Sequence, residues 1–527
     1  MGQRLTRNCF SGEGTAGPVM NFVTWNVAAI NNNPFEYWVT HDDAAYLKLM
    51  EDVMHFIDKP TPEQDVTVAT VFSDGLFEEL AKAMAEQGWK GVEETRKAWK
   101  EDYSKRGIIS GIIKDKQLGA KRLVSMPDRM TNTIGLADGT SKCRPTVISN
   151  YSDKLPDIPT WWAVWKGFMF DSELELLSKG SVKRQRPCQL LTPIPHSKYP
   201  AITEEEEKIS VPLQALCCAI FDAVLVYMLN TVASSTWHGV KTSLCESLCS
   251  NKVGLTTKIL ETQYLDASAI FLQEVSGAMV ETLAKSEILK QKFHFLLPAL
   301  LDRKRDQNSV VLASRDVFQA EGAQELTAEV SKVMESSGTS LAAGDLYVAK
   351  VPLVADSSVS VMLGSFHGDT DGLMTIPMIK ALCKEKAKHP GIEIVFGLDA
   401  NAYAKGVDGK KLGAAEFRAA VLAEGLEECW SGVAAESPQQ CCTTFNARTF
   451  LQPQLNKAVS RDKAEWDPST DRNPKDYILF DITKHAVSGP PERDNTGTKG
   501  VFDPNAPFPT LRFPSDHAAL CVRLSQL

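Results

Sequence analysis

The sequence is poor in cysteine and has no excess of positive charge. Its 527 residues include 12 cysteines, far fewer than a disulfide scaffold of this length would carry. None of them forms the paired Cys-x-x-Cys spacing of a structural zinc site. The 57 basic and 66 acidic residues give a net charge of −9, which excludes a protein that coats nucleic acid through uniform positive charge. An enzyme that binds a polyanion at one local site is compatible with this balance.

Residues 1–20 lack the apolar run that a secretory signal requires. They begin with Met1-Gly2 and carry Thr6, which fits the motif for myristoylation on Gly2, and Cys9 is a candidate for palmitoylation. One acyl chain alone gives only marginal membrane binding. We expect a flexible N-terminal segment on an intracellular, cytoplasmic protein, with peripheral membrane contact if Gly2 is acylated and an unmodified tail otherwise.

One apolar segment, residues 211–233, has about the length of a membrane span. Asp222 lies in its middle, and a charge at the centre of a bilayer costs about 2.5–3.5 kcal/mol on insertion scales. We therefore expect a buried core helix and no transmembrane helix.

Strands and helices alternate along much of the chain, which predicts an α/β protein. The expected strands are residues 21–30, 269–273, 309–313, 346–351, 359–366, 392–398, 477–481 and 518–524. A stretch with a different pattern separates the first strand from the others, because residues 59–210 contain a long amphipathic helix, a basic stretch and a tryptophan cluster. We expect residues 21–58 and 211–527 to form one catalytic domain, and residues 59–210 to form an insertion after the first strand-helix unit.

Six short segments place polar side chains where apolar strand-like runs end. Sites in layered α/β proteins gather at such strand ends. The segments are Thr24-Trp25-Asn26-Val27, Phe271-Leu272-Gln273-Glu274-Val275, Ser365-Phe366-His367-Gly368-Asp369, Gly397-Leu398-Asp399-Ala400-Asn401, Lys475-Asp476-Tyr477-Ile478-Leu479 and Pro514-Ser515-Asp516-His517.

The carboxylates of Glu274 and Asp516 are hard oxygen ligands suited to Mg²⁺, and Asn26 adds a neutral oxygen or an amide donor. Mn²⁺ accepts the same oxygen ligands. These three residues are therefore the candidate metal ligands.

The other segments supply groups for acid–base chemistry. His367 and His517 can donate to phosphate oxygens that gain charge in the transition state. Asp399 can accept a proton from an attacking water that Asn401 helps to orient. Asp476 beside His517 would fix the imidazole and favour its protonated form. The set suits in-line attack of water on phosphorus.

In this order, the six segments resemble those of the endonuclease/exonuclease/phosphatase superfamily, which includes apurinic endonucleases, pancreatic-type DNases, poly(A) deadenylases, inositol 5-phosphatases and neutral sphingomyelinases. The resemblance covers residues 20–58 and 255–527. It implies a four-layer α/β sandwich of two mixed β-sheets flanked by helices, and Mg²⁺-dependent hydrolysis of phosphoesters. It also implies that Glu274 is the main metal ligand, that Asp399 is the base, and that Asp476 is the partner of His517 or a second carboxylate near the metal.

The spacing departs from the family, because Asn26 and Glu274 lie 248 residues apart, where a few tens are usual. The insertion 59–210 could shape substrate access or serve as a cover or oligomerisation module. Its basic stretch and tryptophans could contact nucleic acid, but basic runs more often form a solvated helix face and tryptophan clusters more often form a core. Asp369 could contact a substrate or cation, or simply belong to a turn.

The segment Pro474-Lys475-Asp476-Tyr477 lacks the aromatic-Cys-Asp-Arg signature of the inositol 5-phosphatases. We therefore favour a phosphodiesterase that acts on nucleic acid or nucleotides. Two alternatives remain, a phospholipid or sphingolipid phosphodiesterase at a membrane surface and a catalytically inactive binding scaffold.

Overall fold

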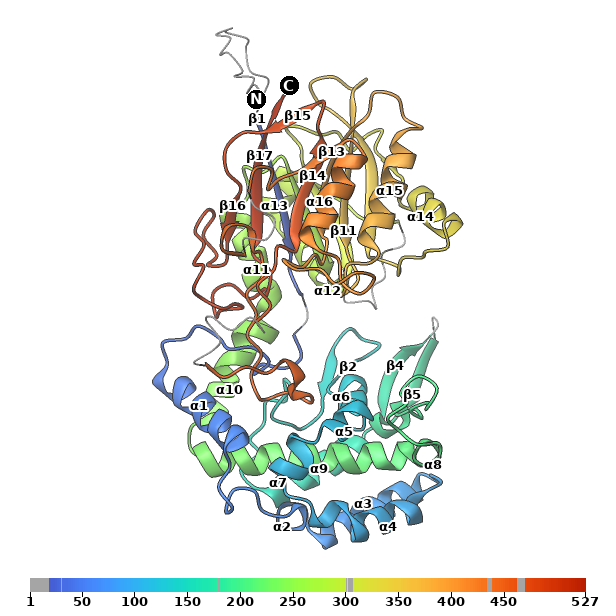
Figure 1. Cartoon of the computed structure of the whole chain (residues 1–527), viewed down its shortest axis with the longest axis vertical. Helices are drawn as coiled ribbons and strands as arrows, with labels where there is room; N and C mark the ends of the chain where they lie inside the picture. The colour runs from blue at the N-terminus through green and yellow to red at the C-terminus, as the bar shows by residue number, and fades with distance from the viewer. Residues whose placement is uncertain are drawn as a thin grey trace, which may run out of the picture.

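A computed structural model describes residues 19–29, 31–178, 181–299, 301, 307–433, 438–461 and 470–527 (Figure 1). Two lobes are visible, an α/β sandwich and a mainly helical lobe. The helices α10 (Trp237–Cys245) and α11 (Lys252–Gln263) run between them. Gly2 and Cys9 lie outside the described residues.

The first sheet of the sandwich has the strand order β15-β17-β1-β6-β8-β7, with β16 beside β17. Its strands are β1 (Val19–Asn26), β6 (Ala269–Val275), β7 (Phe293–Leu296), β8 (Asn308–Ser314), β15 (His485–Val487), β16 (Glu492–Asp494) and β17 (Ala519–Gln526). The sheet is mixed, because β1 runs parallel to β6 and antiparallel to β17. Side chains of α11, α12 (Gly277–Lys285) and α13 (Glu287–Lys292) share a core with its outer face.

The second sheet has the order β13-β14-β12-β11-β10-β9. Its strands are β9 (Gln324–Glu325), β10 (Leu346–Pro352), β11 (Ser360–His367), β12 (Glu393–Asp399), β13 (Leu426–Glu428) and β14 (Asp476–Asp481). Here β11 and β12 are parallel and the other pairs antiparallel. Helices α14 (Thr327–Ser336), α15 (Thr375–Lys386) and α16 (Ala414–Ala423) contribute to its core.

The two sheets face each other closely. Phe22 and Phe271 of the first sheet belong to the same apolar cluster as the strands of the second, and a Cβ on Gly397 of β12 would lie 2.5 Å from Cδ2 of Phe271. Glycine at this position lets the sheets approach. The predicted four-layer α/β sandwich of two mixed sheets with helices outside is confirmed.

The helical lobe is built around α9 (Ser210–Ala233), which is buried along most of its length. The elements around it are α1 (Ala44–Asp58), α2 (Val68–Val71), α3 (Asp74–Glu86), α4 (Val92–Glu101), α5 (Lys116–Ala120), α6 (Ser125–Thr131), α7 (Ile158–Lys166), α8 (Glu204–Lys208), α10, and the hairpins β2 (Thr133–Gly135)–β3 (Ser141–Cys143) and β4 (Leu174–Ser178)–β5 (Ser181–Gln185). A further short helix, α17 (Pro438–Cys441), lies in the C-terminal half of the chain.

The packing differs from the expected division at residues 58 and 211. Helices α1, α9 and α10 belong to the core of the helical lobe, and so do Ala447, Leu451 and Val459 from a segment far along the chain. The physical reason is that α9 is apolar on every side, so other helices must surround it. Its position in the sequence just before the sandwich does not determine where it packs.

Helix α9 is long and apolar enough to cross a membrane by length and composition, yet 78% of its apolar window is buried inside the protein. Asp222 in its middle is completely buried. It accepts hydrogen bonds from Arg144 Nε at 2.7 Å, Thr146 Oγ1 at 2.6 Å and Trp165 Nε1 at 2.8 Å. This packing agrees with the expected core helix.

The tryptophans of the insertion are core residues. Trp161, Trp162 and Trp165 lie on α7 and are at most 4% exposed, and the rings of Trp162 and Trp165 stack at 5.6 Å. In the basic stretch, Arg106 is paired with Asp102 and Asp115. The structure therefore favours a core role for the tryptophans over base stacking, and a helix-face role for the basic stretch over nucleic-acid contact.

Candidate active site

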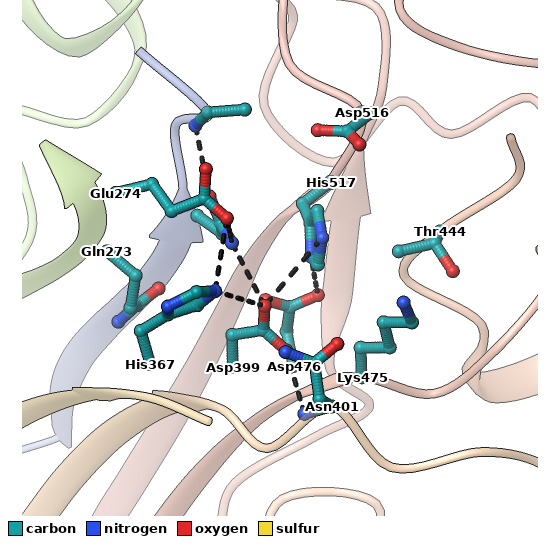
Figure 2. Close-up of polar contacts among 12 residues, drawn as sticks. Gln273, Glu274, His367, Asp399, Asn401, Thr444, Lys475, Asp476, Asp516 and His517 are labelled. Carbon is teal, nitrogen blue, oxygen red and sulfur yellow. Dashed lines mark hydrogen bonds and ion pairs between the residues drawn. The ribbon is translucent and has the colours of Figure 1, made fainter. Parts of the chain in front are cut away.

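Polar residues from both sheets meet at one edge of the sandwich (Figure 2). Asn26 ends β1 and pairs in register with Gln273 beside Glu274 on β6. In the second sheet His367, Asp399 and Asp476 lie side by side, because β11, β12 and β14 pair in that register. The strand ends predicted from the sequence are therefore brought together.

Glu274 forms a hydrogen-bonded group with Asn26 and His367. Its Oε1 atom lies 3.1 Å from Asn26 Nδ2 and 3.0 Å from His367 Nε2. The backbone of Glu274 has a positive φ of 53°, and the pairing of β6 with β8 shifts register between Leu272 and Val275. Such a bulge redirects a side chain, and the Glu274 side chain keeps 23% exposure, so solvent and ligands can reach it.

Charges set the protonation of this group. Burial alone would raise the pKa of Glu274, but the hydrogen bond and charge of His367, helped by Asn26, lower it to about 2. Burial would lower the pKa of His367, and Glu274 and Asp399 outweigh this and raise it to about 9. At neutral pH the pair is thus a carboxylate and an imidazolium.

Asp399 lies at the centre of the site and is 1% exposed. Its Oδ2 atom accepts a hydrogen bond from Asn26 Nδ2 at 2.9 Å and lies 3.7 Å from Nε2 of both His367 and His517 (Figure 2). Its Oδ1 atom accepts the backbone N–H of Asn401 at 2.9 Å. Donors from four residues therefore converge on this one carboxylate.

His517 is held by Asp476, whose Oδ2 atom lies 2.9 Å from His517 Nδ1. Burial would lower the pKa of His517, but Asp476 and Asp399 raise it to about 10. Burial also raises the pKa of Asp476, against the lowering by His517. Ligand atoms of Asp399, Asp476 and His517 lie within 4.8 Å of one another, a spacing that could hold a metal ion.

The remaining predicted residues take other positions. Asn401 has a positive φ of 48° and donates from Nδ2 to the carbonyl of Gly368 at 2.9 Å, so it braces the loop after β12. Asp369 accepts the backbone N–H of Met374 at 2.7 Å, which fits the turn interpretation. Asp516 accepts a hydrogen bond from Tyr37 Oη at 3.3 Å, and Figure 2 shows it apart from Glu274, beside His517.

Sequence reasoning assigned no role to two buried lysines near this site. Lys475 pairs with Asp471 at 2.9 Å, and although burial lowers its pKa, Asp471 and Asp399 raise it overall. Lys252, at the start of α11, is 3% exposed; its pKa is lowered by burial, against Asp516 and Glu274. Lys475 could have been found from the sequence, because it directly precedes Asp476. Lys252 could not, because it lies on a helix that carries no motif.

Comparison with known proteins gives a family model described as a domain of unknown function (DUF8234), which matches residues 65–242. This range extends through α9 into α10, as the packing of the helical lobe does. No curated protein matches the chain by sequence.

Several solved structures are similar to part of the chain. TDP2 from D. rerio, complexed with a single-strand DNA product, is 13% identical, with 53% of this chain and 95% of that chain covered and a TM-score of 0.34. The human Nocturnin catalytic domain with bound sulfate is 11% identical, with 50% and 82% covered and a TM-score of 0.31. An endonuclease/exonuclease/phosphatase protein from Bacteroides vulgatus is 12% identical, with 54% and 94% covered and a TM-score of 0.35. Likenesses this distant say nothing about the substrate of this chain.

Proposed function

We propose that this chain is a member of the endonuclease/exonuclease/phosphatase superfamily and hydrolyses phosphodiesters of nucleic acid or nucleotides with the help of a divalent cation. The observation that carries the proposal is the joining of six strand ends into one cluster of hydrogen bonds and ion pairs centred on Asp399. Burying carboxylates, an amide and two imidazoles together is costly, which supports an active site over a binding scaffold.

The residues fit a hard cation such as Mg²⁺ or Mn²⁺. The Oδ1 atom of Asp476 is buried and has no hydrogen-bond partner among the described residues, and a buried oxygen left this way is costly unless a ligand satisfies it. Glu274, Asn26 and Asp516 remain the proposed ligands, and Asp399 and Asp476 offer a second carboxylate group. When bound, the cation would polarise a phosphoryl oxygen and acidify water.

The chain's own residues supply the rest of the chemistry. His367 and His517 are both imidazolium groups at neutral pH and both approach Asp399. Once substrate enters, these cations can donate to phosphate oxygens that gain charge in the transition state. Asp399 can accept the proton of the attacking water. Asp399, Asp476 and His517 are buried, and the low local dielectric strengthens the interactions that they make.

Cations beside the site support a substrate with several phosphates. Lys457 is exposed, and its pKa is lowered by partial burial and by the nearby charges of Arg448, Lys475 and Lys411. Lys411 Nζ and Lys475 Nζ lie 4.4 and 5.4 Å from the ring centroid of Tyr403. Positive charge with an interleaved aromatic ring is what a nucleic-acid backbone and base require.

The test is hydrolysis by the purified chain with Mg²⁺ or Mn²⁺, with and without EDTA. The substrate panel contains single-stranded poly(A), duplex DNA, a cyclic dinucleotide, sphingomyelin and an inositol polyphosphate. We expect EDTA-sensitive cleavage of a nucleic acid or nucleotide that Glu274→Ala abolishes, while Glu416→Ala, an exposed glutamate on α16, keeps full activity. Cleavage of sphingomyelin alone would select the lipid alternative, and no turnover on any substrate would select the scaffold.

The cytoplasmic location and the acylation of Gly2 stay proposals of the sequence. Mass spectrometry of the N-terminal peptide from cells that produce the chain tests the modification, and fractionation of the same cells tests membrane association. An unacylated peptide in a soluble fraction would contradict the anchoring proposal.

A further inference from the structure

The helical lobe contains a cavity of about 890 Å³, well within the range of small-molecule sites. Its walls are mainly apolar and come from distant parts of the chain: Ile113, Leu118 and Val124 around α5, Phe221 of α9, and Phe450 and Leu455 of the segment that crosses from the sandwich. The cavity is partly open to solvent, so a ligand can enter it from outside.

One strained cation lines this cavity. Arg122 has a positive φ of 65°, which is unusual for a residue with a side chain. Its Nη1 atom donates to Gln454 Oε1 at 3.3 Å, and its guanidinium lies 5.6 Å from the ring centroid of Tyr199. Its Nε atom is buried and has no hydrogen-bond partner among the described residues. Arg122 therefore places a guanidinium among the apolar walls of the cavity.

We infer that this cavity binds a single-chain amphiphile whose anionic head pairs with Arg122 and whose hydrocarbon chain lies along the apolar wall. A carboxylate or phosphate head would pair with the Arg122 guanidinium on the lining, because arginine binds such groups with charge-assisted hydrogen bonds. Lys116 on the cavity lining is exposed and adds positive charge.

A nucleobase suits the cavity less well. Gln454 is one of the polar side chains on the lining that could recognise a base edge, but its amide is already used. Its Nε2 atom donates to the Gly119 carbonyl at 2.9 Å and lies 3.3 Å from Ser125 Oγ, while its Oε1 atom accepts from Arg122.

The inference does not depend on the proposed hydrolase activity, because the cavity shares none of its lining residues with the cluster around Asp399.

The test is calorimetric titration of the full chain with dodecanoate, dodecyl phosphate and dodecanol, each below its micelle-forming concentration. We expect saturable binding of about one equivalent of at least one anion, and at least 10-fold weaker binding of the uncharged alcohol. The anion with the higher affinity identifies the head group as carboxylate or phosphate. Absence of saturable binding for both anions would overturn the inference.

Two variants test the apolar wall of the cavity and the contact with the anionic head group separately. Leu118→Trp should fill the cavity and weaken binding of all three ligands at least 10-fold. Arg122→Gly should weaken the anions at least 5-fold without changing dodecanol, and it should fold, because glycine adopts a positive φ without strain. Arg184→Gln on β5, which removes an exposed arginine outside the cavity, is the control. Unchanged anion affinity in either cavity variant would overturn the site.

Discussion

His517 is fixed between two carboxylates, with Nδ1 at 2.9 Å from Asp476 Oδ2 and Nε2 at 3.7 Å from Asp399 Oδ2. The two aspartates lie directly opposite each other on β12 and β14. The ring therefore cannot turn without losing its bond to Asp476, and both of its nitrogens face negative charge.

Replacing Asp476 with asparagine should lower kcat by roughly 10²–10⁴-fold, the range seen when the carboxylate behind a catalytic imidazole is neutralised. The change removes the charge that holds His517 protonated and leaves the side-chain shape nearly intact. KM and the thermal midpoint should change little. A kcat within threefold of the native value would contradict the role of Asp476.

Glu274 is the next target, because its lowered pKa keeps it ionised at neutral pH. Glu274→Gln and Asp399→Asn should each abolish hydrolysis without unfolding the chain, since each amide occupies the same volume. Steady-state rates and circular dichroism measure the two effects, and calorimetric titration with Mn²⁺ reports the loss of metal affinity in Glu274→Gln. Full activity in either purified variant would remove that residue from the mechanism.

Two exposed lysines, Lys411 beside Tyr403 and Lys457 near the charge of Lys411, should set the affinity for polyanions. Lys457→Gln combined with Lys411→Gln should weaken oligonucleotide binding at low salt and reduce the slope of log K against log salt by roughly one for each lost phosphate contact. Fluorescence anisotropy between 50 and 200 mM salt measures both quantities. Lys332→Gln on α14, an exposed lysine of the second sheet's outer layer, should leave both unchanged. An unaltered slope in the double variant would exclude contact with phosphate.

Gly397→Ala should destabilise the sandwich by about 1–3 kcal/mol, because the added methyl would overlap Phe271 of the facing sheet. The urea midpoint should fall accordingly. Gly239→Ala is the matched change, since Gly239 lies inside α10 with open space around its Cβ; it should raise stability by up to about 1 kcal/mol. Equal midpoints for the two variants would show that the sheets can move apart at no cost.

Glu428 should make stability fall as pH rises from about 4.5 to 7. Burial raises its pKa to about 7, although Arg418 and the backbone N–H of Trp430 partly oppose the shift. The folded chain therefore retains a proton that the unfolded chain has released, and folding is favoured at the acidic end of this window. The contribution lost across it is on the order of 3 kcal/mol.

Glu428→Gln removes this titration. The variant should lack that part of the pH dependence when urea midpoints are compared between pH 4.5 and 7. Identical pH profiles for the native chain and the variant would contradict the proposed shift.

Much of the sandwich was predictable from the sequence, because its strands are short apolar runs with polar ends. The expected strands 346–351 and 392–398 differ from Leu346–Pro352 and Glu393–Asp399 by one residue at most. The short strands β15 and β16 were missed, because three residues carry too little pattern to distinguish a strand from a loop. The convergence of His367, Asp399 and Asp476 followed once the strands were placed in one sheet.

Other features depend on tertiary packing that no local pattern reveals. Helix α9 is apolar on every side and has no distinct polar face, so its periodicity could not indicate which lobe surrounds it. Lys252 reaches the site from a helix, and the cavity beside Arg122 forms only when residues near 120 and near 454 meet. To predict any of these features, one must know which segments that are distant in the sequence lie close together in the folded protein.

The position of β1 between β6 and β17 also constrains how the chain can fold during synthesis. Trp25 donates to the carbonyl of His517, 492 residues further along, and Val19 pairs with Ser525. The ribosome therefore delivers the first strand long before its neighbour on one side, while the helical core that includes α1 and α9 is already complete in its first 250 residues apart from the crossing segment. The helical lobe can therefore fold while β1 still lacks β17, which is synthesised much later.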